Sequence, residues 1–198
     1  MAINKVMRAA LKAITTLDSD VKKTYKMERQ FERLTARLRG KPSDYRMWDC
    51  VIRYGDHIIP VRLFVPNGEG PFPLLLFFHG GGWVTGGIEN YTGVCADLAK
   101  ATGCTVASVD YRLAPEYKFP AAPEDCYAAA RAFFLGRMPD VNVDDITLIG
   151  DSAGGNLAAA VSLMARDRGE FLPKRQILIY PSTYNDHSET SPFPSVRE

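Results

Sequence analysis

The sequence contains only four cysteines, and they lack any metal-binding arrangement. Cys50, Cys95, Cys104 and Cys126 are far apart, with no CxxC pair and no spacing typical of a zinc site. Each lies within an apolar segment. We therefore expect buried free thiols in a reducing compartment, and no metal centre.

Long hydrophobic runs are also absent. The sequence has no stretch of 18 apolar residues, which argues against a membrane-spanning helix. The first residues lack the compact apolar block and the small-residue cleavage site of a signal peptide. These two absences predict a cytoplasmic protein without stable membrane insertion.

A large net charge is absent too, because 24 Lys and Arg stand against 23 Asp and Glu. Residues 1–41 nevertheless hold 11 basic and 4 acidic side chains, whereas the remainder holds 13 and 19. A basic helical segment of this kind could contact nucleic acid or an anionic membrane. The sequence, however, has no nucleic-acid-binding motif and no GxxxxGK[ST] phosphate loop. We expect no nucleic-acid partner, and we expect the basic residues to form the solvated face of helices whose other face is docked.

The composition is that of one globular domain with a small appendage, since 46% of the 198 residues are apolar and 24% are charged. Apolar residues recur at steps of three and four over residues 3–17, which predicts an amphipathic helix. A second predicted helix has Ser19 or Asp20 as its cap and stops at Gly40 and Pro42. One face of this second helix carries Met27, Phe31, Leu34 and Leu38.

From residue 45 onward, the pattern predicts strands that alternate with helices. Segments 45–54 and 57–65 predict two antiparallel strands joined through Gly55 and Asp56. The apolar run 73–78 predicts a strand that is covered on both faces. The alternation predicts a mostly parallel sheet with helices on both faces. Further helices are predicted at 93–102, 123–135 and 153–168, and further strands at 104–110, 145–150 and 175–180.

A Gly-x-Ser-x-Gly motif joins the predicted strand at 145–150 to the helix that follows it. This is the layout of a nucleophile elbow, a sharp turn that presents a serine hydroxyl, here that of Ser152, at the top of a sheet. Gly150 and Gly154 stand two residues either side of Ser152, where side chains would collide as the chain folds back. A glycine-rich turn with an ordinary serine is the alternative, and the context of the motif decides between the two.

A second glycine-rich motif directly follows the buried strand 73–78. Acyl transfer through a serine creates an oxyanion, which needs fixed hydrogen-bond donors. Backbone N–H groups can act as these donors where glycines let the chain approach closely. A mere flexible turn is the alternative, but the elbow downstream, in the right order, argues against it. The motif reads His79-Gly80-Gly81-Gly82-Trp83.

A third stretch, residues 110–116, predicts a strand end followed by a loop punctuated by proline. Its spacing implies no acid–base role. We expect Asp110 and Glu116 to form structural ion pairs or turn hydrogen bonds, and we do not choose Asp110 as the acid of a catalytic triad.

Together, HGGGW, DYRLAPE with FPAA, and GDSAGG resemble the hormone-sensitive-lipase-like family of α/β-hydrolases, in its bacterial acetyl esterase and carboxylesterase branch. The resemblance covers roughly residues 45–181. It implies an α/β-hydrolase fold and a serine esterase of short acyl esters that uses neither a metal nor an organic cofactor. It also implies an N-terminal helical cap segment at 1–42, a partial core at 43–181 and the start of a second cap segment at 182–198.

The resemblance also implies roles for single residues. By position, Ser152 is the nucleophile, and the N–H groups of Gly81, Gly82 and Ala153 form the oxyanion hole. The expected partner is a small ester, and a homo-oligomer stays open.

The remaining motif residues shape the loop and the substrate site. His79 and Gly80 belong to the oxyanion loop, and we expect His79 to organise this loop by hydrogen bonding and not to act as the base. Trp83 and Asp151 would line the substrate site. For Trp83, packing of the loop alone is the alternative.

The sequence departs from the family after Ser152. A serine nucleophile needs a histidine and a carboxylate, which follow the serine along the chain in this fold. The only histidine after Ser152 is His187, beside Asp186, and neighbours in sequence point apart. We expect His57 to be a surface or core histidine. The triad Asp and His are thus expected to be missing, in a chain that is incomplete at its C-terminus.

Two other hypotheses stay open. Some members of the family, such as plant gibberellin receptors, lack the catalytic histidine and hold a small ligand under the cap, so the chain could be a non-catalytic binding protein. An inactive truncated fragment is the other alternative. In a chain that is incomplete at its C-terminus, the predicted strand 175–180 would lack the neighbours that cover its edge, and an exposed apolar edge invites aggregation.

Overall fold

The computed structural model describes residues 21–38, 46–136 and 141–183. The helix expected at 3–17 lies outside the described residues, as do the predicted cap of the second helix at Ser19 or Asp20 and its stop signal at Gly40 and Pro42. The same holds for Asp186, His187 and most of the segment 182–198.

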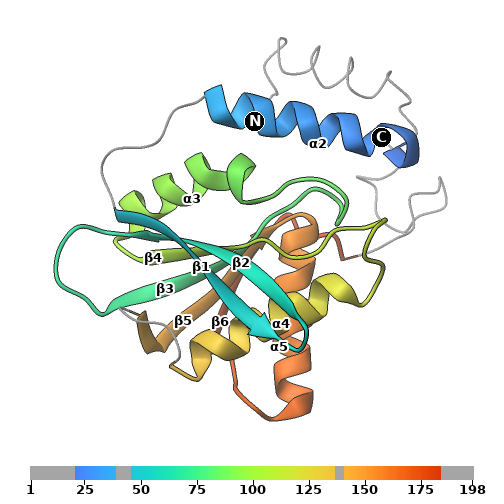
Figure 1. Ribbon diagram of the computed structural model, residues 1–198. Helices are drawn as coiled ribbons and strands as arrows, with labels where there is room; N and C mark the ends of the chain where they lie inside the picture. The colour runs from blue at the N-terminus through green and yellow to red at the C-terminus, as the bar shows by residue number, and fades with distance from the viewer. Residues whose placement is uncertain (1–20, 39–45, 137–140, 184–198) are drawn as a thin grey trace, which may run out of the picture.

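The described strands form one mixed sheet in the order β1-β2-β4-β3-β5-β6 (Figure 1). Strand β2 pairs antiparallel with both β1 and β4, whereas β3 pairs parallel with β4 and β5, and β5 with β6. The predicted, mostly parallel sheet is confirmed. The strands are β1 (Arg46–Tyr54), β2 (His57–Val65), β3 (Phe72–Phe78), β4 (Thr105–Val109), β5 (Val141–Asp151) and β6 (Arg175–Ile179).

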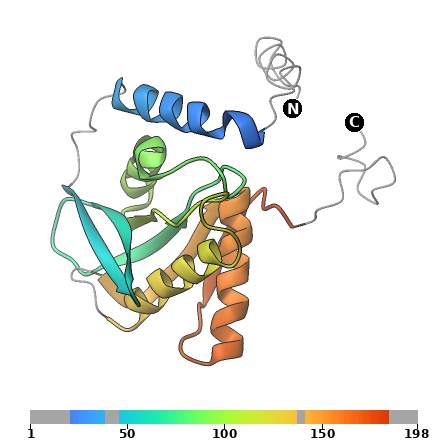
Figure 2. The ribbon, with the colours of Figure 1, turned by 45° about the vertical axis from the view of Figure 1, so that its right-hand side comes forward.

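Helices cover both faces of this sheet, as the alternation predicted (Figure 2). Helix α3 packs on one face, and α4 and α5 pack on the other, while α2 lies beyond α3 (Figure 1). The helices are α2 (Val21–Leu38), α3 (Ile88–Thr102), α4 (Ala121–Phe134) and α5 (Ala153–Arg168).

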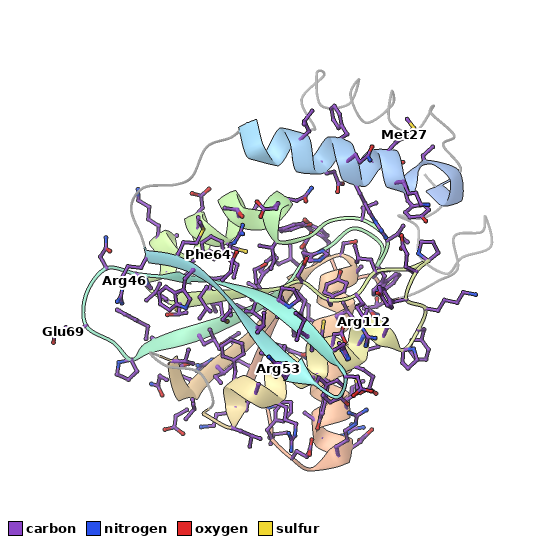
Figure 3. All side chains as sticks on the ribbon, viewed as in Figure 1. Met27, Arg46, Arg53, Phe64, Glu69 and Arg112 are labelled. Carbon is purple, nitrogen blue, oxygen red and sulfur yellow. The ribbon has the colours of Figure 1, made fainter. Side chains whose placement is uncertain are left out.

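The central strand β3 has a continuous apolar run because both of its faces are packed. Leu76 and Phe78 are fully buried in the larger cluster, against α4 and α5. Leu75 and Phe77, at the alternate positions, are buried with Cys95 of α3 in the smaller cluster. Phe64 of β2, labelled in Figure 3, belongs to this smaller cluster as well.

Two predicted elements begin a full turn or several residues earlier than the sequence pattern indicated. Helix α3 starts at Ile88 instead of residue 93, and β5 starts at Val141 instead of residue 145. The first turn of α3 contains Glu89, Asn90 and Tyr91, which interrupt the apolar periodicity. Polar side chains at a helix start form local and tertiary hydrogen bonds instead, so periodicity alone misses them.

Helix α2 corrects the expectation that its basic side faces solvent while its other side docks. Met27, Phe31 and Leu34 are 70%, 69% and 62% exposed, and Met27 lies on the side of α2 away from the sheet (Figure 3). Arg29 and Glu32 instead bond to two loops of the core. These loops present backbone C=O and N–H groups, which need polar partners where they are removed from water.

All four cysteines are free, and two of them, Cys95 and Cys126, are buried. Cys50 and Cys104 are only half-buried, so the prediction of buried thiols is correct for Cys95 and Cys126 and wrong for the other two. Burial raises the pKa of the Cys95 thiol to about 12. Among the described helices, none is long and apolar enough to cross a membrane.

Candidate active site

Two parallel strands end side by side and place both predicted motifs at the same edge of the sheet. Strand β3 ends at Phe78 and β5 ends at Asp151, with Phe78 paired to Gly150. The glycine loop 79–87 leaves from the first end, and the turn at Ser152 leaves from the second. In open α/β sheets, ligands bind at this carboxyl edge.

Ser152 forms the sharp turn between β5 and α5, as the motif predicted. Its backbone has φ 51° and ψ −117°, a conformation that residues other than glycine rarely adopt. The Ser152 N–H donates to the Ile179 carbonyl at 2.9 Å, and the Ser152 carbonyl accepts from the N–H groups of Asn156 and Ser182, both at 3.1 Å. The turn is therefore fixed on both sides by β6 and α5.

Gly150 and Gly154 have the steric reason that the sequence suggested. A Cβ on Gly150 would collide with the backbone of Gly154, and one on Gly154 would collide with the Phe78 carbonyl. The elbow thus packs directly on the end of β3, so that neither position can carry a side chain without moving the backbone.

The glycine loop turns back at Gly81, whose carbonyl accepts the N–H groups of Val84 at 3.0 Å and of Thr85 at 2.8 Å. Gly81, Gly82 and Trp83 all have positive φ, at 114°, 59° and 61°. Neither the Gly81 N–H nor the Gly82 N–H has a hydrogen-bond acceptor among the described residues. The N–H of Ala153, the first residue of α5, lacks an intrahelical partner, as in any helix.

A half-buried hydrogen-bond network ties the loop to the elbow. The Asp151 carboxylate accepts the Gly80 N–H at 2.9 Å and the Tyr91 hydroxyl, also at 2.9 Å. Burial, followed by the charge of Asp151, raises the pKa of Tyr91 well above its ordinary value. Sequence analysis missed Tyr91, which carries no motif and precedes the predicted start of its helix. We expected Asp151 to line the substrate site, and its carboxylate accepts hydrogen bonds from Gly80 of the loop and from Tyr91.

His79 is fully buried and forms the hydrogen bond that we expected of it. Its Nδ1–H donates to the Gly80 carbonyl at 2.8 Å, and its ring stacks on Tyr111 with centroids 4.2 Å apart. The Tyr111 hydroxyl donates to the His79 carbonyl at 2.7 Å. Burial lowers the pKa of His79, which keeps the ring neutral. Its contacts are those of a loop organiser.

The third motif has the structural role predicted for it. Asp110 accepts the N–H of Ile88 at 3.3 Å at the start of α3, and Glu116 pairs with Arg29 at 3.1 Å. Within the same stretch, Arg112 binds the buried Asp125 through its backbone N–H, at 3.0 Å, and through two guanidinium nitrogens, at 2.9 and 2.7 Å. Arg112 is labelled in Figure 3.

His57, which we expected at the surface or in the core, binds the same carboxylate. Its Nε2 lies 2.8 Å from Asp125 Oδ1, and its side chain is 29% exposed. This histidine is therefore engaged in the support of the 110–116 loop. Residues 153–183 contain no histidine, so the described part of the chain offers no further candidate for a base. It also holds no cluster of three His, Cys, Asp or Glu side chains that could bind a metal.

An apolar cavity of about 390 Å³ opens beside the glycine loop. Gly82 and Trp83 line it from the loop, and Leu157 and Ala160 line it from α5. Trp83 also packs against the larger core cluster, and its carbonyl accepts the Ala114 N–H at 2.9 Å. The two roles weighed for Trp83, lining a cavity and packing the loop, are thus both compatible with its position.

The comparisons with known proteins agree with this architecture. The α/β hydrolase fold family matches residues 75–197. An arylesterase of Saccharolobus solfataricus is 41% identical over 148 residues, which make up 72% of this chain and 47% of that protein. The esterase LipI of Mycobacterium tuberculosis is 38% identical over 176 residues, 84% of this chain and 54% of that protein.

Solved structures show the same similarity. The hyperthermophilic esterase of the archaeon Pyrobaculum calidifontis superposes with a TM-score of 0.80 at 38% identity, covering 91% of this chain and 59% of that one. The chain spans about half the length of the curated relatives it matches. With the elbow, the glycine loop and the sheet order in place, the chain belongs to the hormone-sensitive-lipase-like branch of the α/β-hydrolase fold family.

Proposed function

We propose that this chain carries the nucleophile half of a serine esterase site that acts on short-acyl carboxylic esters. The observation that carries the proposal is the Gly80–Asp151 hydrogen bond of 2.9 Å, which fixes the glycine loop against the elbow that presents Ser152. The similarity to an arylesterase and to other esterases, at 38–41% identity, supports the same reaction class.

In the proposed reaction, the Ser152 Oγ attacks the carbonyl carbon of the ester and passes its proton to a base. The tetrahedral oxyanion then accepts hydrogen bonds from the N–H groups of Gly81, Gly82 and Ala153. The oxyanion collapses, and the alcohol leaves with the proton. Water next attacks the acyl-enzyme, releases the acid and restores the serine hydroxyl.

The base is the part that the described residues do not supply. His57 is bonded to Asp125, His79 is buried in the glycine loop, and no histidine lies between residues 153 and 183. We therefore propose that the triad Asp and His are missing from this chain. Without a triad base, solvent must take the proton of Ser152, so we expect the attack by its hydroxyl to be slow and hydrolysis to be far below that of a complete relative.

The direct test is the release of 4-nitrophenol from 4-nitrophenyl acetate by the 198-residue chain and by its Ser152→Ala variant. We expect slow hydrolysis that the Ser152→Ala substitution abolishes, with both proteins showing the same cooperative unfolding transition. Equal rates for the two folded proteins would disprove the proposal.

Short acyl chains suit the cavity beside the loop. Its volume of about 390 Å³ is at the low end of ligand pockets, which run from roughly 300 to 1,000 Å³. We expect kcat/KM to be higher for acetate and butyrate esters than for a decanoate ester. A preference for decanoate would contradict this assignment while leaving the esterase itself intact.

A non-catalytic binding protein is the second candidate, and the absence of histidine from residues 153–183 favours it. It predicts saturable binding of 4-nitrophenyl acetate, measured by calorimetry, without any release of 4-nitrophenol that depends on Ser152. Release that depends on Ser152 would exclude it.

A further inference from the structure

Helix α2 reaches the candidate site through one arginine that contacts two loops at once. Arg29 Nε donates to the Val84 carbonyl, and Nη2 donates to the Ala114 carbonyl, both at 2.7 Å. Its Nη1 lies 3.1 Å from both oxygens of Glu116. The Arg29 side chain is only 16% exposed, and its guanidinium also stacks 4.8 Å from the ring centroid of Tyr25.

The contacts of Arg29 lead directly to the glycines of the loop. Val84, whose carbonyl Arg29 binds, donates its own N–H to the Gly81 carbonyl at 3.0 Å. Ala114, the other carbonyl partner, donates its N–H to the Trp83 carbonyl at 2.9 Å. One guanidinium therefore closes a ring of hydrogen bonds around the turn that begins at Gly81.

A second side chain of α2 supports the same turn. The Glu32 carboxylate, three residues after Arg29, accepts the Gly86 N–H at 3.1 Å. The far end of the loop is thereby held to the helix as well. Residues three apart on a helix lie on one face, so Arg29 and Glu32 grip the loop together.

Arginine has the geometry that this position requires. Its planar guanidinium carries five donors in a fixed fork, and here three nitrogens serve three acceptors that come from two loops. A lysine at the same place would supply a single point charge on a flexible stem, which cannot hold all three acceptors in one geometry.

We propose that Arg29 is a positioning residue, which holds the glycine loop so that the N–H groups of Gly81 and Gly82 face the reacting carbonyl. The catalytic purpose of this arrangement rests on the proposed function, whereas the hold on the loop does not. A purely structural role, in which Arg29 anchors α2 and leaves the loop unaffected, is the alternative that an experiment must exclude.

Amide hydrogen exchange separates the two roles, because the N–H groups of Val84 and Thr85 bond to Gly81 and not to α2. We compare the full chain with its Arg29→Met and Arg29→Lys variants by NMR. For Arg29→Met we expect exchange at Val84 and Thr85 to rise at least tenfold, with α5 unchanged, and for Arg29→Lys a smaller rise. Faster exchange in α2 alone, or unchanged exchange at both amides, would overturn the proposal.

The matched control is Arg166→Met on α5. Arg166 is 63% exposed and pairs with its neighbour Asp167, so its removal should leave the exchange of both loop amides unchanged. If Arg29→Met does not show a cooperative unfolding transition, the Arg29→Lys variant is used as the test. Exchange at Val84 and Thr85 equal to that of the wild type would then refute the proposal that Arg29 holds the loop.

Ester hydrolysis supplies the second readout. If hydrolysis by the wild type depends on Ser152, Arg29→Met should lower kcat about 10- to 100-fold, because small misplacements of catalytic groups have effects of this size. KM should change little, and Arg166→Met should change neither constant. An unaltered kcat would overturn the catalytic role of Arg29. Absence of any hydrolysis that depends on Ser152 in the wild type would instead refute the proposed function, while the exchange data still decide whether Arg29 holds the loop.

Discussion

Ser152 combines a reactive position with an unfavourable backbone. Its φ of 51° and ψ of −117° lie in a region that only glycine occupies freely. Such a residue costs about 1–3 kcal/mol and persists only where its surroundings hold it. Here the N–H of Ser152 bonds to β6, and its carbonyl bonds to α5 and to Ser182. The strain is the physical consequence of presenting a side chain at the tip of a sharp turn.

Replacing Ser152 by glycine should therefore stabilise the fold. Relief of about 1–3 kcal/mol of strain outweighs the roughly 0.5–1 kcal/mol entropic cost of a glycine. We expect the free energy of unfolding of Ser152→Gly to be about 1 kcal/mol higher than that of Ser152→Ala. Urea titrations followed by circular dichroism measure both values. Both variants lack the hydroxyl, so the comparison isolates the backbone. A glycine variant no more stable than the alanine variant would contradict the strain.

His79 should make stability depend on pH. Its pKa in the folded protein is lowered by burial, although the charges of Asp110 and Asp151 oppose the shift. As the pH falls, the unfolded chain therefore binds this proton first, near its ordinary pKa of about 6.5. Stability is full above that value and is lost below it, by at most about 1.4 kcal/mol per pH unit.

Urea unfolding at pH 7.5 and at pH 5.5 tests this expectation. The free energy of unfolding should be lower at pH 5.5 in the wild type, and the difference should shrink in His79→Gln. The control is His57→Gln, whose ring is partly exposed beside Asp125, and which retains the contribution of His79. An equal pH difference in the wild type and His79→Gln would refute the assignment.

At the scale of elements, prediction succeeded where one pattern dominated. The bounds of β2 and α5 agree with the predicted 57–65 and 153–168. Helix α2 shows the limit of such patterns, since periodicity tells which residues share a face and not which face docks. Met27 and Phe31 share a face, yet both are mostly exposed, because the loops beside α2 offer polar groups to Arg29 and Glu32.

The orientation of α2 predicts the effect of a polar substitution on its apolar side. Met27 is 70% exposed, so Met27→Gln should change the free energy of unfolding by less than about 0.5 kcal/mol. Leu76→Ala is the contrasting variant, because Leu76 is fully buried and its truncation should cost about 2–5 kcal/mol. Chemical denaturation measures both. A loss above 1 kcal/mol for Met27→Gln would show that this face is packed.

At the scale of the whole molecule, the site divides into local and distant parts. Ser152 and the glycine loop were found because each motif is a short segment whose own backbone forms the turn. The sequence did not predict the roles of Arg29 and Glu32, because their partners in the loop are 55 and 54 residues away along the chain. Tyr91 reaches Asp151 across 60 residues. Such contacts depend on how elements pack, and a single sequence carries no local signal of them.

The sheet order leaves β6 at one end of the sheet, paired only with β5 among the described strands. Its Ile177 is 45% exposed, on the same side of the strand as Ile179, which packs on the cluster under α3. An apolar edge strand offers unpaired N–H and C=O groups to another chain, and a lysine at such an edge opposes this pairing. We therefore expect the chain to self-associate through β6 at high concentration.

The substitution Ile177→Lys should lower this association while changing the free energy of unfolding by less than about 0.5 kcal/mol, because the side chain is already largely in water. Sedimentation velocity over a concentration series measures the effect. Val94→Lys is the matched control, since Val94 is 48% exposed on α3 and adds the same charge away from the edge. If both lysines lower the association equally, net charge is the cause, and β6 is not the contact; if Ile177→Lys alone does so, the edge of the sheet is where copies of this chain meet.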